Sequence, residues 1–235
     1  YTVIATVTDP NFQGAATNTL VIIPPSPFTW VTNNGTITIT GSTCPAGQLD
    51  IPSTITDLPV TAIGSFAFNG CTNITAVTIP DSVITIGQSA FSSCTNLTSA
   101  SIGTNVASIG PSAFYYCTSL TNIALPNSVT NIGLMAFLYC PKLAAIAVGP
   151  LNSSYSSLDG VLFNKSMTTL IQCPGGKTGS YSVPASVVTI GNRAFGGTRL
   201  TTITVPNSTT TISEGAFISS PSLTTVTIGN SVTSI

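Results

Sequence analysis

A segment of the form Ile-Gly-x-x-Ala-Phe recurs along this chain at a constant step. A step of about 23 residues is typical of a solenoid, in which each repeat is one supersecondary unit and neighbouring repeats complete each other's hydrophobic core. The repeat therefore constrains the architecture strongly and the chemistry weakly. Its evenly spaced phenylalanines are Phe68, Phe91, Phe114 and Phe137, with later copies at Phe195 and Phe217.

Each repeat also contains two short apolar patterns. The first ends with alternating apolar residues, as in Ile74-x-x-Val77-x-Ile79, and this period of two predicts a short strand with one face inward. A second apolar pair, such as Val83 and Ile86, follows a Pro or Gly and predicts a second short strand. We expect the Ala-Phe pair to lie on a single helical turn, so that each coil is strand, short strand and helical turn in a mainly β fold.

Three segments precede the regular repeats. Residues 1–23 predict a β-hairpin, and residues 24–27 are a Pro-rich linker. Residues 28–66 predict an N-terminal capping unit with a hairpin turn at Asn34-Gly35, and residues 67–235 form the repeats. Because both ends look cut, we expect the sequence to be a slice of a longer protein.

The step is broken once, between Phe137 and Phe195, where the interval is more than twice the regular one. The irregular insertion spans about residues 149–183. Two apolar runs within it, separated by Asn164-Lys165-Ser166, predict an inserted hairpin. Insertions in solenoids often mark binding sites, but this one could equally be a structural element that changes only the curvature of the stack.

The full pattern Leu-x-x-Ile-x-Ile-Pro-x-x-Val-x-x-Ile-Gly-x-x-Ala-Phe-x-x-Cys resembles the BspA-type leucine-rich repeat of bacterial surface proteins, over roughly residues 50–235. The resemblance implies a leucine-rich-repeat solenoid. It also implies a role in adhesion, or in binding host or matrix proteins. The family has no catalytic residues that could be assigned to positions of this sequence.

Two other segments resemble parts of such proteins. The insertion is similar to the irregular unit of the family, with Tyr155, Asp159-Gly160 and Tyr181-x-x-Pro184 in the expected places. Residues 1–23, which include Thr8-Asp9-Pro10, resemble the closing hairpin of the MBG-type β-domains of large bacterial surface proteins. Both resemblances imply an extracellular or cell-surface location.

The composition agrees with such a location. Apolar residues make up 43% of the chain and charged residues only 5%, against roughly 25% charged in typical globular domains. The net charge of −1 gives no support to nucleic-acid binding, and the sequence has no apolar stretch long enough to span a membrane. All five Lys and Arg residues follow Asp81, and this uneven charge could orient copies head to tail or be a chance scatter of few charges.

Catalysis is not expected. The chain has no histidine, so a Ser-His-Asp or Cys-His mechanism lacks its base. The carboxylates fall on separate units, and no acidic loop resembles a calcium-binding motif. We therefore expect no cofactor, no bound metal and no enzymatic activity.

A second ladder accompanies the phenylalanines, three positions after each of the first four. Because parallel side chains that point inward lack bridging geometry, we expect free, buried thiols in preference to disulfides or metal ligands. Two further cysteines, Cys44 and Cys173, lie off the ladder and are expected to be unpaired. The ladder consists of Cys71, Cys94, Cys117 and Cys140.

The outward positions of the first strand form the candidate binding face. This face could bind a protein or glycan ligand, pack against further copies of the chain in a filament or surface layer, or form an ordered threonine array of the ice-binding kind. Threonine also simply suits exposed strand positions. Adhesion is the leading hypothesis, and a structural filament subunit is the alternative. The residues are Thr75, Thr78, Thr98, Ser101, Thr121, Asn122, Thr201, Thr202, Thr204, Thr224, Thr225 and Thr227.

Overall fold

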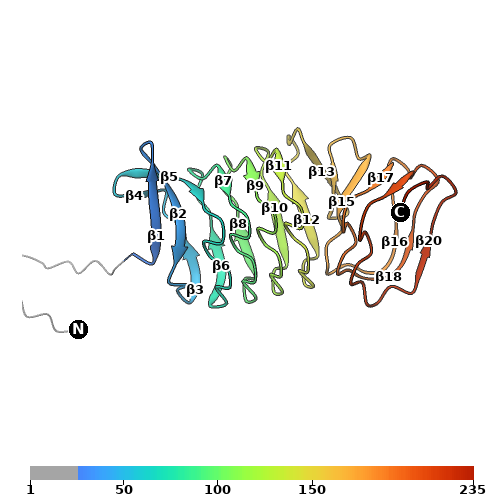
Figure 1. Ribbon diagram of the computed structural model, residues 1–235, viewed down its shortest axis with the longest axis horizontal. Helices are drawn as coiled ribbons and strands as arrows, with labels where there is room; N and C mark the ends of the chain where they lie inside the picture. The colour runs from blue at the N-terminus through green and yellow to red at the C-terminus, as the bar shows by residue number, and fades with distance from the viewer. Residues whose placement is uncertain (1–25) are drawn as a thin grey trace, which may run out of the picture.

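The chain is a long β-solenoid in a computed structural model that describes residues 26–235 (Figure 1). The predicted solenoid is confirmed, since successive coils follow the step of the sequence repeat and their strands pair in parallel. The predicted hairpin of residues 1–23 lies outside the described residues, as does the first half of the linker at 24–27.

The first strand of each early coil joins a five-stranded parallel sheet. Pairing is in register with the repeat, so that Ile123 lies beside Ala100 on one side and Ile146 on the other. Alternate residues of these strands point into the core. In sheet order the strands are β12 (Ala145–Val148), β10 (Asn122–Leu125), β8 (Ser99–Ser101), β6 (Ile74–Thr78) and β3 (Gly47–Asp50).

The second short strands form another sheet on the opposite side of each coil. The capping unit begins this sheet with a β-hairpin, whose strands meet at Asn34-Gly35 as predicted. Its second strand, Thr36–Ser42, pairs in parallel with Leu58–Ile63 of the same unit, and Phe28, Ile37 and Ile39 cover the end of the core. The strands are β1 (Phe28–Asn33), β2 (Thr36–Ser42), β5 (Leu58–Ile63), β7 (Thr85–Ile86), β9 (Ser108–Ile109) and β11 (Asn131–Ile132), with β4 (Thr54–Ile55) beside β5.

The insertion folds as an antiparallel meander and begins a second stack. Its strands are β13 (Tyr155–Leu158), β14 (Val161–Asn164) and β15 (Thr169–Gln172), and the last two form the predicted hairpin. The meander is anchored by the buried amide of Asn152, which donates to the carbonyls of Pro126 and Val129. From β15 the sheet continues through β17 (Thr189–Ile190) and β19 (Thr211–Ile212).

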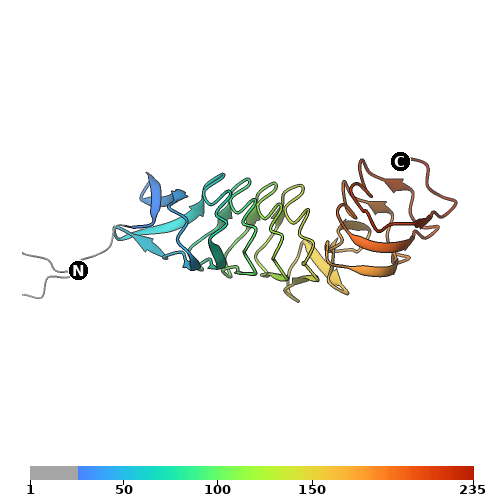
Figure 2. The same cartoon turned by 90° about the horizontal axis from the view of Figure 1, so that it is seen from below.

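The face of the second stack is a separate three-stranded parallel sheet, formed by β16 (Thr178–Ser182), β18 (Arg199–Thr204) and β20 (Thr225–Thr227). Two hydrophobic cores accompany the two stacks, one from Phe28 to Leu162 and one from Val161 onward. Figure 2 shows the orange and red coils turned relative to the green ones. The insertion therefore interrupts both sheets and the core.

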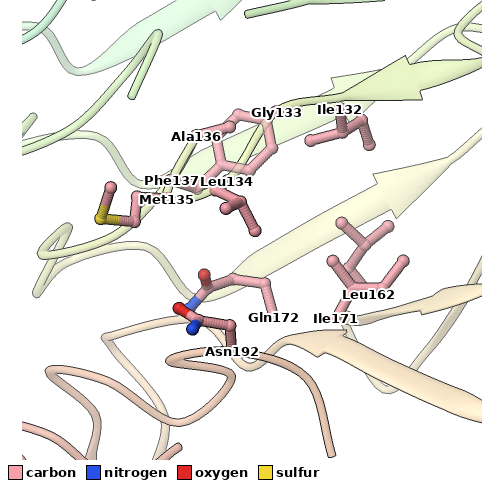
Figure 3. Close-up of a pocket in the computed structure, with 10 residues that line it drawn as sticks. All are labelled: Ile132, Gly133, Leu134, Met135, Ala136, Phe137, Leu162, Ile171, Gln172 and Asn192. Atoms are coloured by element: carbon pink, nitrogen blue, oxygen red, sulfur yellow. The ribbon is translucent and has the colours of Figure 1, made fainter. Parts of the chain in front are cut away.

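A small cavity marks the junction of the two stacks (Figure 3). It has a volume of about 50 Å³ and lies between the turn of Gly133, Leu134 and Met135 on one stack and Gln172 and Asn192 on the other. The sheet that contains β11 ends at this place and the sheet that contains β15 begins. The cavity therefore identifies the point where one coil does not fit the next.

The expected helical turn is absent from the described coils, and a pair of tight turns takes its place. Two residues in each turn region have positive φ, four positions apart, such as Ser112 at 56° and Tyr116 at 59°. A right-handed helix cannot contain left-handed residues, so the chain makes two separate i→i+3 turns. In the coil of Phe114 these are closed by the amides of Ala113 and Tyr115.

The phenylalanine ladder forms the centre of both cores. Within the first stack the rings of Phe68, Phe91, Phe114 and Phe137 lie face to face, with centroid separations of 5.0, 5.3 and 5.8 Å. Phe195 and Phe217 stack in the same way at 5.6 Å in the second. Phe28 of the capping unit closes the ladder with an edge-on contact to Phe68.

The prediction that Cys44 and Cys71 are free thiols is wrong, because they form a disulfide with a Cα–Cα distance of 5.2 Å. Cys44 has a φ of 53°, in a turn outside the regular repeat. Its side chain therefore does not run parallel to that of Cys71, and the geometric objection to bridging does not apply. The bond ties the capping unit to the first regular coil.

Phe114→Ala is expected to lower the free energy of unfolding by about 3–5 kcal/mol, because it leaves a cavity in a fully buried stack. Urea denaturation followed by circular dichroism measures the change. Phe66→Ala is the matched control, since Phe66 is 56% exposed and the loss there should stay within about 0.5 kcal/mol. Equal losses at both positions would contradict a buried ladder.

Cys44→Ser is expected to destabilise the capping unit by about 3.5 kcal/mol, the chain-entropy value for a closed loop of 27 residues. Mass spectrometry of unreduced peptides should recover the Cys44–Cys71 linkage in the parent protein. Stability of parent and variant should then converge in reducing buffer. A parent protein that is insensitive to reductant would argue against the bond.

Candidate functional site

Two parallel sheets, β12-β10-β8-β6-β3 in the first stack and β16-β18-β20 in the second, are called the face sheets here. The residues of the candidate binding face lie on the outer surface of these sheets or directly before their strands. All of them are exposed except Thr78 and Thr202, which are half-buried. Their inward neighbours, such as Val77, Ile123 and Ile203, are buried in the core. The arrangement follows from the two-residue period of a strand, which sends alternate side chains to opposite faces.

Some of these hydroxyls are engaged within the fold. The hydroxyl of Thr98 donates to the carbonyl of Thr75 at 2.8 Å, and the hydroxyl of Thr121 donates to that of Thr98 at 3.2 Å. Thr224 and Thr201 make the same kind of bond in the second stack, at 3.0 and 3.1 Å. Because their protons are used between coils, these threonines reinforce the stack and offer a ligand only their methyl groups and lone pairs.

The second stack presents two parallel rows of hydroxyl groups. Within the part of the chain that the structure describes, these side chains make no hydrogen bond to other protein groups. Their donors and acceptors are therefore open to a ligand, and the parallel register holds them in straight lines. One row is Ser180, Thr202 and Thr225, and the other is Ser182, Thr204 and Thr227.

The face of the first stack changes character along its length. At the β3 end it is polar, where the amide of Gln48 donates to the carboxylate of Asp50 at 2.8 Å. Hydrogen bonds from Gln48 and then Thr78 hold the pKa of this carboxyl below its usual value. At the β12 end the face becomes an apolar hollow of about 320 Å³, lined mainly by Ile102, Ala124, Pro126, Ala147 and Val148.

Sequence reasoning missed part of each face. Ser180 and Ser182 belong to a strand of the irregular insertion, which lacks the repeat motif, so nothing in the periodicity marked them as outward. Gln48 and Asp50 belong to the capping unit, where the motif is also missing. The alternation of exposed and half-buried residues in the run Thr178–Ser182 is weak, and only the pairing with β18 assigns it to this sheet.

The remaining ladder cysteines are free and buried, as predicted. The thiols of Cys94, Cys117 and Cys140 each donate to the backbone carbonyl of the phenylalanine in the preceding coil, at 3.1, 3.1 and 3.2 Å. Ser220 makes the equivalent bond to Phe195 at 2.8 Å. The cysteine ladder is therefore a set of structural hydrogen bonds, and a hydroxyl replaces the thiol in the second stack.

Burial raises the pKa of these thiols. It raises the pKa of Cys94, Cys140 and Cys173 to about 12 and that of Cys117 further still. A thiolate is the reactive form of cysteine, so none of the four is a candidate nucleophile at neutral pH. Cys173 is buried and unpaired, as predicted.

Residues 26–235 contain no group of three or more His, Cys, Asp or Glu that could hold a metal ion. Among the same residues, no helix is long and apolar enough to cross a membrane.

Family comparison identifies the repeat. The BspA type leucine rich repeat region, in 6 copies, matches residues 40–169 and 175–235, so this chain belongs to that family. An MBG domain matches residues 1–26. Members of the repeat family are typically noncatalytic. The gap between the two matched regions falls within the insertion, where the strands depart from the regular step.

Solved structures of bacterial leucine-rich-repeat proteins share the fold. A leucine rich cell surface protein from Faecalibacterium prausnitzii is 22% identical, with 93% of this chain and 79% of that chain covered and a TM-score of 0.56. The pneumococcal vaccine antigen PcpA is 21% identical, with 90% and 71% covered and a TM-score of 0.61. The T. pallidum leucine rich repeat protein TpLRR is 24% identical, with 87% and 81% covered and a TM-score of 0.56. No curated protein sequence matches the chain.

The buried thiols predict that the protein loses stability in alkali. Their pKa in the unfolded chain is near 9, whereas three of them titrate at about 12 in the fold. The contribution of these neutral thiols to the free energy of unfolding is therefore fully present below about pH 9. It is lost between about pH 9 and 12, by up to about 1.4 kcal/mol per pH unit for each thiol. Urea midpoints measured across this range check the slope.

Cys94→Ser is the matched variant for this experiment, since a hydroxyl keeps the donor and does not titrate in this range. Its stability should fall less steeply with pH than that of the parent. Alkylation by iodoacetamide at neutral pH should be negligible in both folded proteins, and rapid labelling of the native protein would contradict burial of the ladder.

Proposed function

We propose that this chain is a noncatalytic repeat module of an extracellular or cell-surface bacterial protein that binds a protein or glycan ligand through its face sheets. The observation that carries the proposal is the pair of open hydroxyl rows on β16, β18 and β20. The hydroxyls of these rows project from a sheet whose central strand is hydrogen-bonded on both sides. A ligand therefore meets donors and acceptors whose positions are already ordered, which lowers the entropic cost of binding.

The side chains of the hydroxyl rows favour adhesion through hydrogen bonds and apolar contact over binding through charged groups. The exposed residues of the rows are neutral and carry hydroxyl groups, with methyl groups on the threonines, so contact with them combines modest apolar burial with hydrogen bonds. The strand Arg199–Thr204 has a charged residue only at its first position. Binding by this face should therefore depend weakly on salt concentration.

A filament or surface-layer subunit is the second candidate function, and the apolar hollow on β10 and β12 favours it. Ala124 and Ala147 lie side by side in the parallel register, and Pro126 and Val148 extend the patch. Covering small apolar side chains with a second copy costs little desolvation free energy, because no charge has to leave water. This face could then join copies of the chain.

Thr204→Val/Thr227→Val is expected to weaken ligand binding about tenfold, because it removes two hydrogen-bonding hydroxyls and retains side-chain shape and β-branching. The ligand is first identified by probing arrays of matrix proteins and saccharides with the whole chain, and affinities are then measured by surface plasmon resonance. Thr85→Val is the control, since Thr85 is exposed on β7 of the other sheet.

Equal affinity in both variants would contradict binding through the hydroxyl rows. Absence of any saturable ligand, together with concentration-dependent assembly in sedimentation velocity, would favour the filament. In that case Ala147→Glu should disperse the assembly, because it places a charge in the centre of the hollow.

A further inference from the structure

A groove that the binding face does not include runs along the turn side of the coils, across the junction of the two stacks. Four coils contribute to it, and each contributes the second and the fourth residue after the repeat phenylalanine. Its volume is about 330 Å³, at the small end of the range for ligand pockets. The lining residues are Tyr116, Thr118, Tyr139, Pro141, Gly197, Arg199, Ser219 and Pro221, and we call this site the tyrosine groove.

One ring of the groove is held in place from three sides. The hydroxyl of Tyr139 donates to that of Ser219 at 3.0 Å, although the two residues are 80 positions apart. The same ring lies on Gly197, where an added Cβ would be 2.6 Å from its Cδ1 atom. Tyr115 packs edge-on against it with a centroid distance of 5.5 Å. The aromatic surface is therefore preorganised and spans the junction.

The backbone at these tyrosines is unusual. Tyr116 and Tyr139 have φ angles of 59° and 58°, in the left-handed region that a bulky side chain rarely adopts. Other coils place Gly70, Ser93 or Gly197 at the same position. Since the coil needs only a left-handed residue here, the backbone does not explain the choice of tyrosine at Tyr116. Tyr116 keeps 47% of its surface exposed, so its ring is available to a ligand.

Positive charge gathers at the same place. Arg199 lines the groove and is exposed, and its backbone amide donates to the carbonyl of Lys177 in the adjacent segment. Lys142 directly follows Pro141 of the lining and is also exposed. No residue of the lining is acidic. A ligand in the tyrosine groove therefore meets one guanidinium and no carboxylate in the lining.

We propose that the tyrosine groove is a second ligand site, distinct from the sheet face, and that it binds an acidic saccharide that carries a carboxylate. The faces of Tyr116 and Tyr139 contact the apolar side of a sugar ring. The guanidinium of Arg199 receives the carboxylate in a two-pronged hydrogen bond. The hydroxyl of Thr118 donates to the carbonyl of Thr95, so it accepts from a sugar hydroxyl. The hydroxyl of Ser219 accepts from Tyr139, so it donates to a sugar oxygen. The volume suits one or two sugar rings.

A saccharide fits these surroundings better than an acidic peptide does. Extended peptides gain much of their affinity by main-chain hydrogen bonds to an open strand edge. The groove offers no open strand edge, because Arg199 is its only residue in a strand and β18 is paired on both sides. The amides of Tyr116 and Gly197 are also paired, with the carbonyls of Leu138 and Ile218. Recognition is therefore left to flat rings, hydroxyl groups and a guanidinium, which match the groups of a sugar acid.

The test uses the whole chain and a matched pair of probes, sialyllactose and lactose, which differ by the acidic sugar. Saturation-transfer NMR should show contact between sialyllactose and the tyrosine rings, and titration calorimetry should give an affinity that exceeds that for lactose. Arg199→Gln should weaken the binding of sialyllactose by about tenfold or more and leave lactose unchanged. Hyaluronan hexasaccharide, which carries a carboxylate on alternate sugars, should behave like sialyllactose.

Two further variants separate binding from folding. Tyr116→Ser reproduces the residue that Ser93 supplies in the preceding coil, so the fold should be retained while the binding of both probes weakens. Lys165→Gln removes a positive charge on the insertion, away from the groove lining, and should leave affinity within about twofold of the parent.

The proposal is overturned if neither acidic saccharide binds at millimolar concentration, or if binding is unaffected by Arg199→Gln and Tyr116→Ser. Tighter binding of an oligoglutamate peptide with the same dependence on both residues would assign the groove to acidic peptides instead. Thr204→Val/Thr227→Val should leave the binding of sialyllactose unchanged, so failure at the sheet face and failure at the groove are distinguishable.

Discussion

Close, in-register stacking of successive backbones is the constraint on which the rest of this structure depends. At the Ile-Gly position the coils approach so closely that a Cβ at Gly87 or Gly110 would lie 2.7 or 2.6 Å from backbone of the preceding coil. The amide at this point donates to a carbonyl of the coil before it, as Gly110 does with Ile86, and Ser213 makes the same bond in the second stack. The stacked rings, the thiol bonds and the hydroxyl rows all inherit their spacing from this contact.

Elements that repeat could be predicted from the sequence. Phe91 and Phe114 were placed on one ladder, and Val77 and Ile123 on the inner face of a strand, because each occupies the same position in several copies. One exception is the helical turn. Ser112 and Tyr116 adopt left-handed conformations that their residue types do not suggest, so propensity alone gave the wrong local structure.

Features that join unlike segments could not be predicted in this way. The Cys44–Cys71 bond connects a turn of the capping unit to a regular coil, and the repeat gives no register between them. Ser180 and Ser182 reach the binding face only through pairing with β18. The tyrosine groove unites Tyr139 with Arg199, which become neighbours because the insertion folds aside and lets two distant coils meet. A repeat period reports what the copies share, whereas these sites depend on how the copies differ.

The division into two hydrophobic cores has a mechanical consequence. A force applied along the axis of the solenoid passes from coil to coil through hydrogen bonds that recur at every step, except where β11 and β15 do not pair and a cavity of about 50 Å³ lies between the stacks. Load is therefore concentrated at that joint. The hydrogen bonds that cross this joint include those from Tyr139 to Ser219 and from the amide of Gly176 to the carbonyl of Leu143, and they connect two halves that each have a core of their own.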